Sequence, residues 1–345
     1  MIPSDLMFYI KTTETCNLDC AHCFTSGKNG KKIYFDPKKV ASWVNQIKAV
    51  RPDANCHFEY HGGEPFLAKT ADMWEFYNLT KDIWPNATYG ATTNLVYKLT
   101  EEKLEFMDKV LNKRIGTSWD PKIRFSNERQ RDLFESNVKF LLDRGYTIKL
   151  FVSLTREVIG KEPIELLRYA KSLGIQELDL ERVTSNGSAK KNLFVFPANI
   201  ELQKWFLKLH EQTQEHGARD WFDNGFLENV YAKFETGFTK AGTFCRDCEQ
   251  KLFTINADGG VSGCPNAAPE EAFGHIDTPA AEVINAPKRC QIIASELSRD
   301  PRCYHCPVYK YCGGDCHQLE WEGDVCPAPK LLMLRMDEEI NGIIN

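Results

Sequence analysis

Residues 6–27, LMFYIKTTETCNLDCAHCFTSG, place a short β-rich run directly before three cysteines. Cys16, Cys20 and Cys23 follow one another in the spacing C-x3-C-x2-C. A structural zinc site takes four ligands and a disulfide takes two thiols. A four-iron cluster, in contrast, can be held by three thiolates while one iron stays open to an exogenous ligand. The spacing therefore favours an iron–sulfur cluster with an open iron, just after the first strand.

The first half of the chain alternates between β-rich runs and amphipathic stretches. Such alternation predicts an α/β fold in which crossover helices join parallel strands. Six units are fewer than the eight that close a barrel, so we expect a partial (β/α)6 TIM-like barrel with its chemistry at the carboxyl strand ends. The expected strands are 6–13, 56–61, 88–94, 115–120, 147–155 and 177–183. The expected helices are 36–50, 101–112, 128–145 and 163–174.

The pattern changes near residue 217, where cysteines become dense. Residues 198–216 are typical of a connecting helix, and 252–264 of a β-hairpin that turns at Asp258-Gly259-Gly260. We therefore expect two domains, 1–216 and 217–345.

Composition narrows the class of protein. The chain has 345 residues, with 43 basic and 48 acidic side chains and a net charge of −5. This balance gives no electrostatic reason to expect nucleic acid or an anionic membrane as a partner. No signal peptide and no apolar run of about 20 residues is visible, so a cytoplasmic location is expected. In a reducing compartment, 13 cysteines indicate metal binding or catalysis rather than disulfides.

The three-cysteine loop resembles the signature of the radical S-adenosylmethionine (SAM) family. The resemblance implies a [4Fe–4S] cluster on Cys16, Cys20 and Cys23, whose open iron binds the amino and carboxylate groups of SAM. In that family, electron transfer from the cluster cleaves SAM to a 5′-deoxyadenosyl radical, which abstracts hydrogen from the substrate. His22, before the third cysteine, is then expected beside the cofactor. A zinc site or structural cysteines are the alternatives.

Motifs at other strand ends are similar to SAM contacts of the same family. Gly62-Gly63-Glu64-Pro65 matches its GGEP motif, which binds the SAM amino group, although alone it is equally a strand-ending turn. Further expected contacts are Thr93, Asn94, Ser118, Arg124 and Glu181. Leu95 stands where the family commonly has glycine, and Arg124 is alternatively a surface residue.

The cysteines from 245 to 326 resemble the SPASM extension of radical SAM enzymes, with its G-x4-C and C-x2-C-x5-C-x3-C patterns. The resemblance implies two auxiliary [4Fe–4S] clusters, and three clusters in all. The first set of ligands is Cys245, Cys248, Cys264 and Cys316; the second is Cys303, Cys306, Cys312 and Cys326. Without the N-terminal loop, two zinc ribbons would be the better interpretation.

Eight thiolates close both auxiliary clusters, which suits electron relay and therefore oxidative bond formation. Two cysteines, Cys56 and Cys290, fall outside every group. We expect both to be buried and structural, although Cys290 is alternatively a spare thiol that returns a hydrogen atom in a peptide epimerase.

The leading functional hypothesis is an enzyme that matures a ribosomally made peptide by forming a carbon–carbon or thioether crosslink. The alternatives are oxidation of Ser or Cys to formylglycine, as in anaerobic sulfatase maturases, peptide epimerisation, and a non-enzymatic zinc-binding interaction scaffold. Expected partners are the precursor peptide or protein and a flavodoxin- or ferredoxin-type electron donor. Since few residues precede the first strand, peptide recognition is expected to be direct or to come from a separate peptide-recognition protein. The general base is not identified; candidates near strand ends are Glu59, Tyr60, Asp120 and Asp179.

Overall fold

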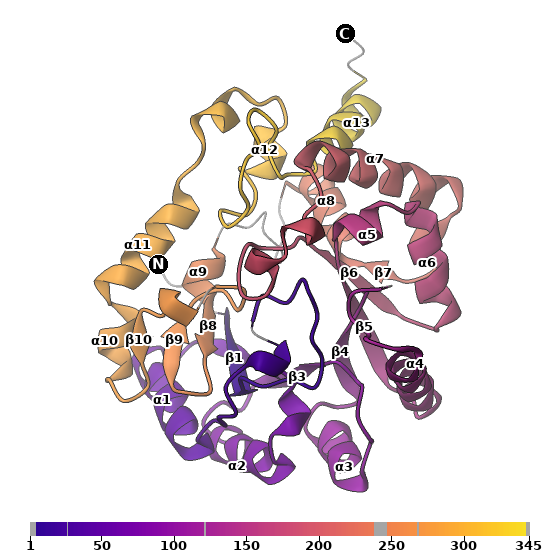
Figure 1. Cartoon of the computed structure of the whole chain (residues 1–345). Helices are drawn as coiled ribbons and strands as arrows, with labels where there is room; N and C mark the ends of the chain where they lie inside the picture. The colour runs from indigo at the N-terminus through magenta and orange to yellow at the C-terminus, as the bar shows by residue number, and fades with distance from the viewer. Residues whose placement is uncertain (1–4, 26, 121, 238–246, 268, 343–345) are drawn as a thin grey trace.

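A computed structural model describes residues 5–25, 27–120, 122–237, 247–267 and 269–342. Within these ranges, one sheet has the strand order β10-β9-β8-β1-β2-β3-β4-β5-β6-β7. All neighbouring pairs from β8 and β1 through β7 are parallel, whereas β8–β9 and β9–β10 are antiparallel. The strands curve into an open arc with helices on its outer side (Figure 1). The expected partial barrel is confirmed.

Six strands of the barrel lie close to their expected positions. They are β1 (Asp5–Thr13), β2 (Asn55–Gly62), β3 (Thr88–Thr93), β4 (Arg114–Trp119), β5 (Thr147–Ser153) and β6 (Glu177–Glu181). A seventh parallel strand, β7 (Asp223–Asn224), pairs with β6 and was not expected. Three further strands belong to the cysteine-rich part: β8 (Leu252–Ile255), β9 (Gly260–Ser262) and β10 (Gly274–His275).

Helices cross between the strands and cover the outer face of the sheet. In the barrel they are α1 (Pro37–Val50), α2 (Thr70–Thr80), α3 (Glu101–Lys109), α4 (Glu128–Asp143), α5 (Arg156–Ile159), α6 (Pro163–Ser172), α7 (Asn199–Glu215) and α8 (Gly225–Glu235). The remaining ones are α9 (Cys248–Lys251), α10 (Ala280–Ile284), α11 (Pro287–Leu297), α12 (Tyr309–Cys312) and α13 (Lys330–Asn341). Side-chain oxygens of Asp36, Thr100 and Asn127 accept backbone hydrogen bonds at the starts of α1, α3 and α4, as N-caps do.

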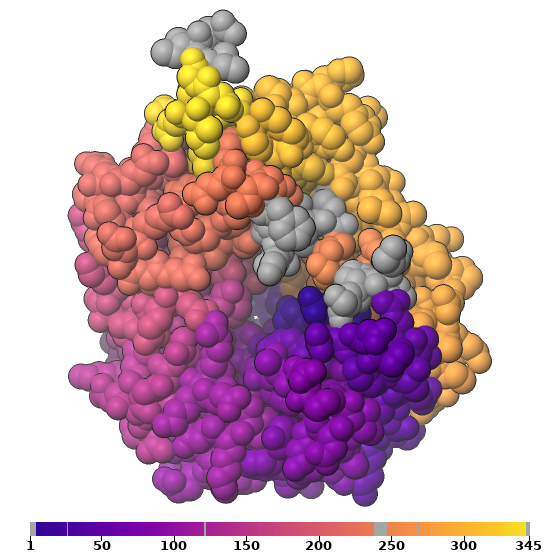
Figure 2. Space-filling model, turned by 180° about the vertical axis from the view of Figure 1, so that it is seen from behind, coloured from indigo at the N-terminus to yellow at the C-terminus, as the bar shows by residue number. Residues whose placement is uncertain are grey.

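Alternation along the strands separates an apolar outer face from a polar inner face. On the outer face, Phe8 of β1 stacks on Phe58 of β2, with ring centroids 5.3 Å apart, and both are fully buried. On the inner face, Tyr9 packs edge-on against His61 at 5.8 Å. Because side chains alternate along a strand, this inner face collects the polar residues of neighbouring strands inside the barrel. Viewed from behind, the surface is hollowed near its centre (Figure 2).

The expected hairpin forms as β8 and β9, but β8 also continues the barrel sheet. It pairs in parallel with β1, from Met7–Leu252 to Ile10–Ile255. Phe253 stacks on Phe8 with ring centroids 5.5 Å apart. The cysteine-rich segment is therefore joined to the strand that precedes the first cysteine loop. A domain boundary near residue 217 stays a prediction. Among the described residues, no helix has the length and apolar character needed to cross a membrane.

Candidate active site

The first cysteine loop leaves β1 and lies inside the arc of strands (Figure 1). The Cys16 thiol accepts hydrogen bonds from the Leu18 backbone NH (3.4 Å) and from the Asn94 side-chain amide (3.5 Å). The same amide donates to Asn17 Oδ1 at 2.7 Å, and Asn17 donates to the Val96 carbonyl at 2.7 Å. Asn94, an expected SAM contact, therefore links the loop to the end of β3.

Cys16, Cys20 and Cys23 line one pocket together with all nine expected cofactor-binding residues. These nine are His22, Gly62, Gly63, Glu64, Thr93, Asn94, Ser118, Arg124 and Glu181. Burial raises the pKa of Cys16 to about 11 and that of Cys20 to about 12. Since iron binds thiolates, these thiols would have to lose their protons to hold an iron–sulfur cluster.

The two glycines of the GGEP motif allow close backbone approach. A Cβ atom on Gly62, whose φ is +138°, would stand 2.3 Å from the Thr13 carbonyl oxygen. One on Gly63 would stand 2.0 Å from the Thr15 carbonyl oxygen. Backbone hydrogen bonds from Gly63 to Thr13 (2.9 Å) and from Glu64 to Thr15 (3.0 Å) hold the motif against the chain just before Cys16. Glycine is therefore needed at both positions for space.

Glu64 points away from solvent and joins the ends of two strands. Its carboxylate accepts hydrogen bonds from the Thr93 hydroxyl (2.7 Å), the Asn94 NH (2.7 Å) and the Phe66 NH (3.1 Å). Burial raises its pKa to about 7 even though these three bonds favour the charged form. In this structure Glu64 fixes the ends of β2 and β3; a direct contact with SAM stays a prediction.

His22, Asp120 and Arg124 form a buried cluster at the edge of the pocket. Asp120 Oδ2 lies 3.0 Å from His22 Nε2 and accepts a hydrogen bond from Arg124 Nε at 3.1 Å. The Arg124 side chain is 11% exposed, which excludes the surface alternative. Among the described residues, His22 Nδ1 and Asp120 Oδ1 are buried without a hydrogen-bond partner. These two atoms are therefore available to form hydrogen bonds with a ligand bound beside Cys20 and Cys23.

The four candidates for a general base occupy different surroundings. Tyr60 faces the helices and donates to the Met73 carbonyl at 3.0 Å, away from the barrel interior. Asp120 is in the buried cluster just described, and Asp179 pairs with Lys149 Nζ at 2.8 Å. Glu59 is on the inner face, hydrogen-bonded to His57 and Thr92.

Sequence reasoning missed several residues of the inner face. Lys11 is 2% exposed, and burial lowers its pKa although Glu14, Cys23 and Cys264 favour the charged form. Burial lowers the pKa of His61, which lines the pocket, to about 4. Glu181, already an expected SAM contact, also opens onto the pocket, and its surroundings raise its pKa to about 7, with burial as the largest cause and Asp179 next. The alternation of β1 and β2 is the signal that could have identified Lys11 and His61.

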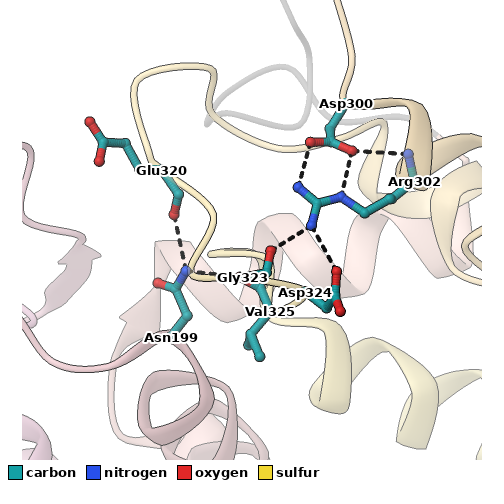
Figure 3. A network of polar contacts seen from close by, with 7 residues as sticks. All are labelled: Asn199, Asp300, Arg302, Glu320, Gly323, Asp324 and Val325. Atoms are coloured by element: carbon teal, nitrogen blue, oxygen red, sulfur yellow. Dashed lines mark hydrogen bonds and ion pairs between the residues drawn. The ribbon is translucent and has the colours of Figure 1, made fainter.

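The second expected set of auxiliary ligands is gathered around one cavity. Cys303, Cys306, Cys312 and Cys326 line a space of about 160 Å³. A polar network fixes the segment before Cys326 (Figure 3). There Asn199 Nδ2 donates to the carbonyls of Glu320 (3.0 Å) and Val325 (3.1 Å). Arg302 donates to both oxygens of Asp300 at 2.8 and 2.7 Å and to Asp324 at 3.2 Å. Four thiols around one cavity fit a [4Fe–4S] cluster by donor chemistry.

The first auxiliary set is described in part. Cys245 lies outside the described residues. Burial raises the pKa of Cys264 and brings that of Cys316 to about 11, and each lies near the Glu249 carboxylate. Glu249 Oε2 accepts from the Cys264 NH at 3.3 Å.

An ion pair lies between the two auxiliary groups. Arg182 donates to Asp315 Oδ1 at 2.8 Å, and the two side chains are 8% and 1% exposed. Burial opposes the charged form of Arg182, but Asp315, together with smaller contributions from the neighbouring Cys316 and Cys312, outweighs it and raises the pKa of Arg182. Within the described ranges, no three Cys, His, Asp or Glu side chains converge closely enough for a single metal ion.

The two ungrouped cysteines differ from each other. Cys56 is 5% exposed in β2, as expected for a structural residue. The expectation of a buried Cys290 is wrong, since this residue is exposed. It lies on α11, which is partly open to solvent.

Comparison with known proteins agrees with the geometry. Residues 245–307 match the SPASM family, an iron–sulfur cluster-binding domain. No curated protein matches the sequence. The structure of anSMEcpe with bound AdoMet and Cp18Cys peptide is similar, with a TM-score of 0.80, 17% identity, and coverage of 97% of this chain and 96% of that one. Streptococcus suis SuiB bound to precursor peptide SuiA has a TM-score of 0.63 at 15% identity, covering 92% of this chain and 73% of that one. The chain therefore has the fold of radical SAM peptide-modifying enzymes and carries the SPASM domain that its cysteines predict.

Proposed function

We propose that this chain is a radical SAM enzyme that oxidises a peptide or protein substrate, forming a carbon–carbon or thioether crosslink. The observation that carries the proposal is the single pocket in which the three-cysteine loop meets the GGEP turn at the carboxyl ends of parallel strands. The peptides in the titles of the anSMEcpe and SuiB structures support a peptide substrate.

The cofactor set follows from the thiols. Cys16, Cys20 and Cys23 would hold the SAM-binding [4Fe–4S] cluster, and the two auxiliary sets would hold one cluster each. When bound, SAM and its cluster supply the 5′-deoxyadenosyl radical that abstracts a hydrogen atom from the substrate. The chain's own residues position both ligands: Gly62 and Gly63 clear space beside the cysteine loop, and Arg124 and His22 offer donors for a carboxylate. An external flavodoxin- or ferredoxin-type donor would supply electrons.

Formylglycine formation is less well supported. In sulfatase maturases an Asp after the hairpin cysteine is the expected base, whereas Pro265 and Asn266 follow Cys264 here. Asn266 does line the pocket, and its carbonyl accepts a hydrogen bond from Asn186. An amide side chain at this position does not accept a proton, so the chain lacks that base.

The test is co-expression with each short reading frame that flanks the gene, followed by mass spectrometry. A crosslinked peptide loses two hydrogens and shows fragments that stay joined. An unchanged mass with altered stereochemistry would indicate epimerisation. Anaerobically purified protein should be brown and contain iron and sulfide; colourless protein with stoichiometric zinc would overturn the proposal in favour of a zinc scaffold.

A further inference from the structure

We propose that Thr92, Glu59 and His57 form a proton relay, which carries the proton released during substrate oxidation from the pocket to solvent at the amino-terminal strand ends. This inference rests on the proposed function, since it assigns the path of a proton that only an oxidised substrate releases.

The relay is a continuous chain of hydrogen bonds on the inner face of β2 and β3. The Thr92 hydroxyl donates to Glu59 Oε1 at 2.6 Å. Glu59 Oε2 lies 2.9 Å from His57 Nε2, and His57 Nδ1 lies 2.8 Å from the Thr88 hydroxyl. Each member can accept a proton and release one: the Thr92 hydroxyl donates to the Glu59 carboxylate, and the imidazole can take up a proton on one nitrogen and release one from the other.

One end of the relay faces the cofactor pocket, and the other end faces solvent. Thr92 lines the pocket that also contains Cys16, Cys20 and Cys23. Exposure then rises along the relay, from 11% for the Glu59 side chain to 32% for His57. Thr88, the first residue of β3, is exposed. A proton that enters at the cofactor pocket can therefore reach water without crossing the apolar core.

Two glycines on neighbouring strands leave room for the relay. A Cβ atom on Gly90 would stand 2.2 Å from Glu59 Oε2 and 2.9 Å from His57 Nε2. One on Gly116 would stand 3.0 Å from the Thr92 hydroxyl oxygen. Gly90 does not adopt the left-handed backbone conformation that favours glycine. We therefore attribute the glycine at this position to the space that the Glu59–His57 pair occupies.

Other groups of the inner face are less suited to this role. Tyr9 lies near Glu59, but burial and that carboxylate raise its pKa well above 10, so the phenol stays protonated. Asp179 is paired with Lys149. Glu181 lines the pocket directly and is the main rival, so it enters the test below.

The reaction balances with this relay. Forming one crosslink removes a hydrogen atom, a proton and an electron from the substrate. The hydrogen atom goes to the 5′-deoxyadenosyl radical, and the electron goes to a one-electron acceptor of the iron–sulfur class. The proton goes to the Thr92 hydroxyl, which passes its own proton to Glu59. The relay members act through one another, so only Thr92 is placed to touch the substrate.

The experiment compares Glu59→Gln, Thr92→Val and Thr92→Ser with wild-type enzyme. Each protein receives SAM, dithionite and the peptide that wild-type enzyme crosslinks. The readouts are 5′-deoxyadenosine and crosslinked peptide, measured in the same sample. Glu177→Gln is the matched control, because Glu177 is a carboxylate of the same sheet that pairs with Arg114 at 2.6 Å, outside the pocket.

We expect Glu59→Gln and Thr92→Val to form 5′-deoxyadenosine within about twofold of wild type but to lose about 10²-fold or more of the crosslinked product. Thr92→Ser, which keeps the hydroxyl, and Glu177→Gln should retain the product. A packing role for Thr92 would spare the isosteric valine variant, so loss of product in Thr92→Val but not in Thr92→Ser points to the hydroxyl, and near-wild-type 5′-deoxyadenosine shows that the pocket itself is intact. If Glu59→Gln fails to fold, the Thr92 pair decides the question.

The outcomes separate the relay from the proposed function. Absence of crosslinked product from wild-type enzyme overturns the proposed function and the relay with it. Wild-type product yields from both Glu59→Gln and Thr92→Val overturn the relay alone. Loss of product in Glu181→Gln, with Glu59→Gln unaffected, also overturns it, since the proton then leaves through Glu181.

Discussion

Replacing Gly63 by alanine should disable the pocket while leaving most of the fold intact. The added Cβ would stand 2.0 Å from the Thr15 carbonyl oxygen and 2.9 Å from the Cys16 backbone nitrogen. Because real Cβ contacts essentially never fall below 3.0 Å, the turn and the start of the cysteine loop must separate by about 1 Å. Both neighbours are backbone atoms, so no side-chain rotation relieves the collision.

The stability cost of this change is modest, whereas its cost to function is large. Two backbone hydrogen bonds, from Gly63 to Thr13 and from Glu64 to Thr15, would be weakened, at about 1 kcal/mol each. Alanine restricts the unfolded chain more than glycine does, which offsets about 0.4–1 kcal/mol of this loss. We therefore expect the free energy of unfolding to fall by about 1–2 kcal/mol. A displacement of about 1 Å at a reacting centre, in contrast, costs about 10²-fold in rate.

The assay is anaerobic formation of 5′-deoxyadenosine from SAM with dithionite, together with urea unfolding. Gly160→Ala is the matched control. Gly160 has a φ of −69°, and its added Cβ would have no neighbour nearer than 3.2 Å. A Gly63→Ala enzyme that forms 5′-deoxyadenosine at the wild-type rate would refute the close approach of this turn to the cysteine loop.

Asp315→Asn should lower the free energy of unfolding by about 3–5 kcal/mol, because it leaves the buried Arg182 guanidinium without its carboxylate; replacing both residues with apolar ones should recover most of the loss in urea unfolding. Cys312→Ser should reduce iron and sulfide content by one cluster, whereas Cys290→Ser, at an exposed position, should not change either; equal iron in both variants would contradict the ligand assignment. The pKa of Glu64 is raised to about 7 from an ordinary value of 4.5, so between these pH values the folded protein binds more protons at this residue than the unfolded chain does. Stability should therefore fall as pH rises through this window, by up to about 1.4 kcal/mol per pH unit, and pH-dependent unfolding of Glu64→Gln should show a smaller slope.

Much of the barrel could be predicted from the sequence, because its signals are local. The first six parallel strands are short β-rich runs, and several helices start at a capping residue such as Asp36, Thr100 or Asn127. The two-residue β7, Asp223–Asn224, has no such signal. Helix α2 was not predicted: its aromatic residues Trp74, Phe76 and Tyr77 do not form a simple amphipathic stripe. The pairing of β8 with β1 was not predicted either, since the two strands are more than 200 residues apart.

In the candidate site, too, some residues could be predicted from the sequence and others could not. The candidate thiol ligands and the GGEP turn could be predicted because their chemistry is tied to spacing within a few residues, and the structure gathers most of them around common pockets. The roles of Glu59 and Tyr60 could not be separated, because both are polar and adjacent in one strand. The sheet places Tyr60 against Met73 in the core and Glu59 beside Thr92 in the barrel.

The sequence by itself predicted the kind of chemistry: three thiols in one short loop would leave one iron of a cluster open, and eight further cysteines would suit closed clusters. Tertiary structure decided where protons and charges lie. The order of the strands brings Thr92, Glu59 and His57 into one hydrogen-bonded chain, although β2 and β3 are separated by a helix in the sequence. It also places Arg182 against Asp315 between the two auxiliary groups. The physical reason is that ligand spacing is a property of the local chain, whereas burial and long-range hydrogen bonds exist only after the strands have paired.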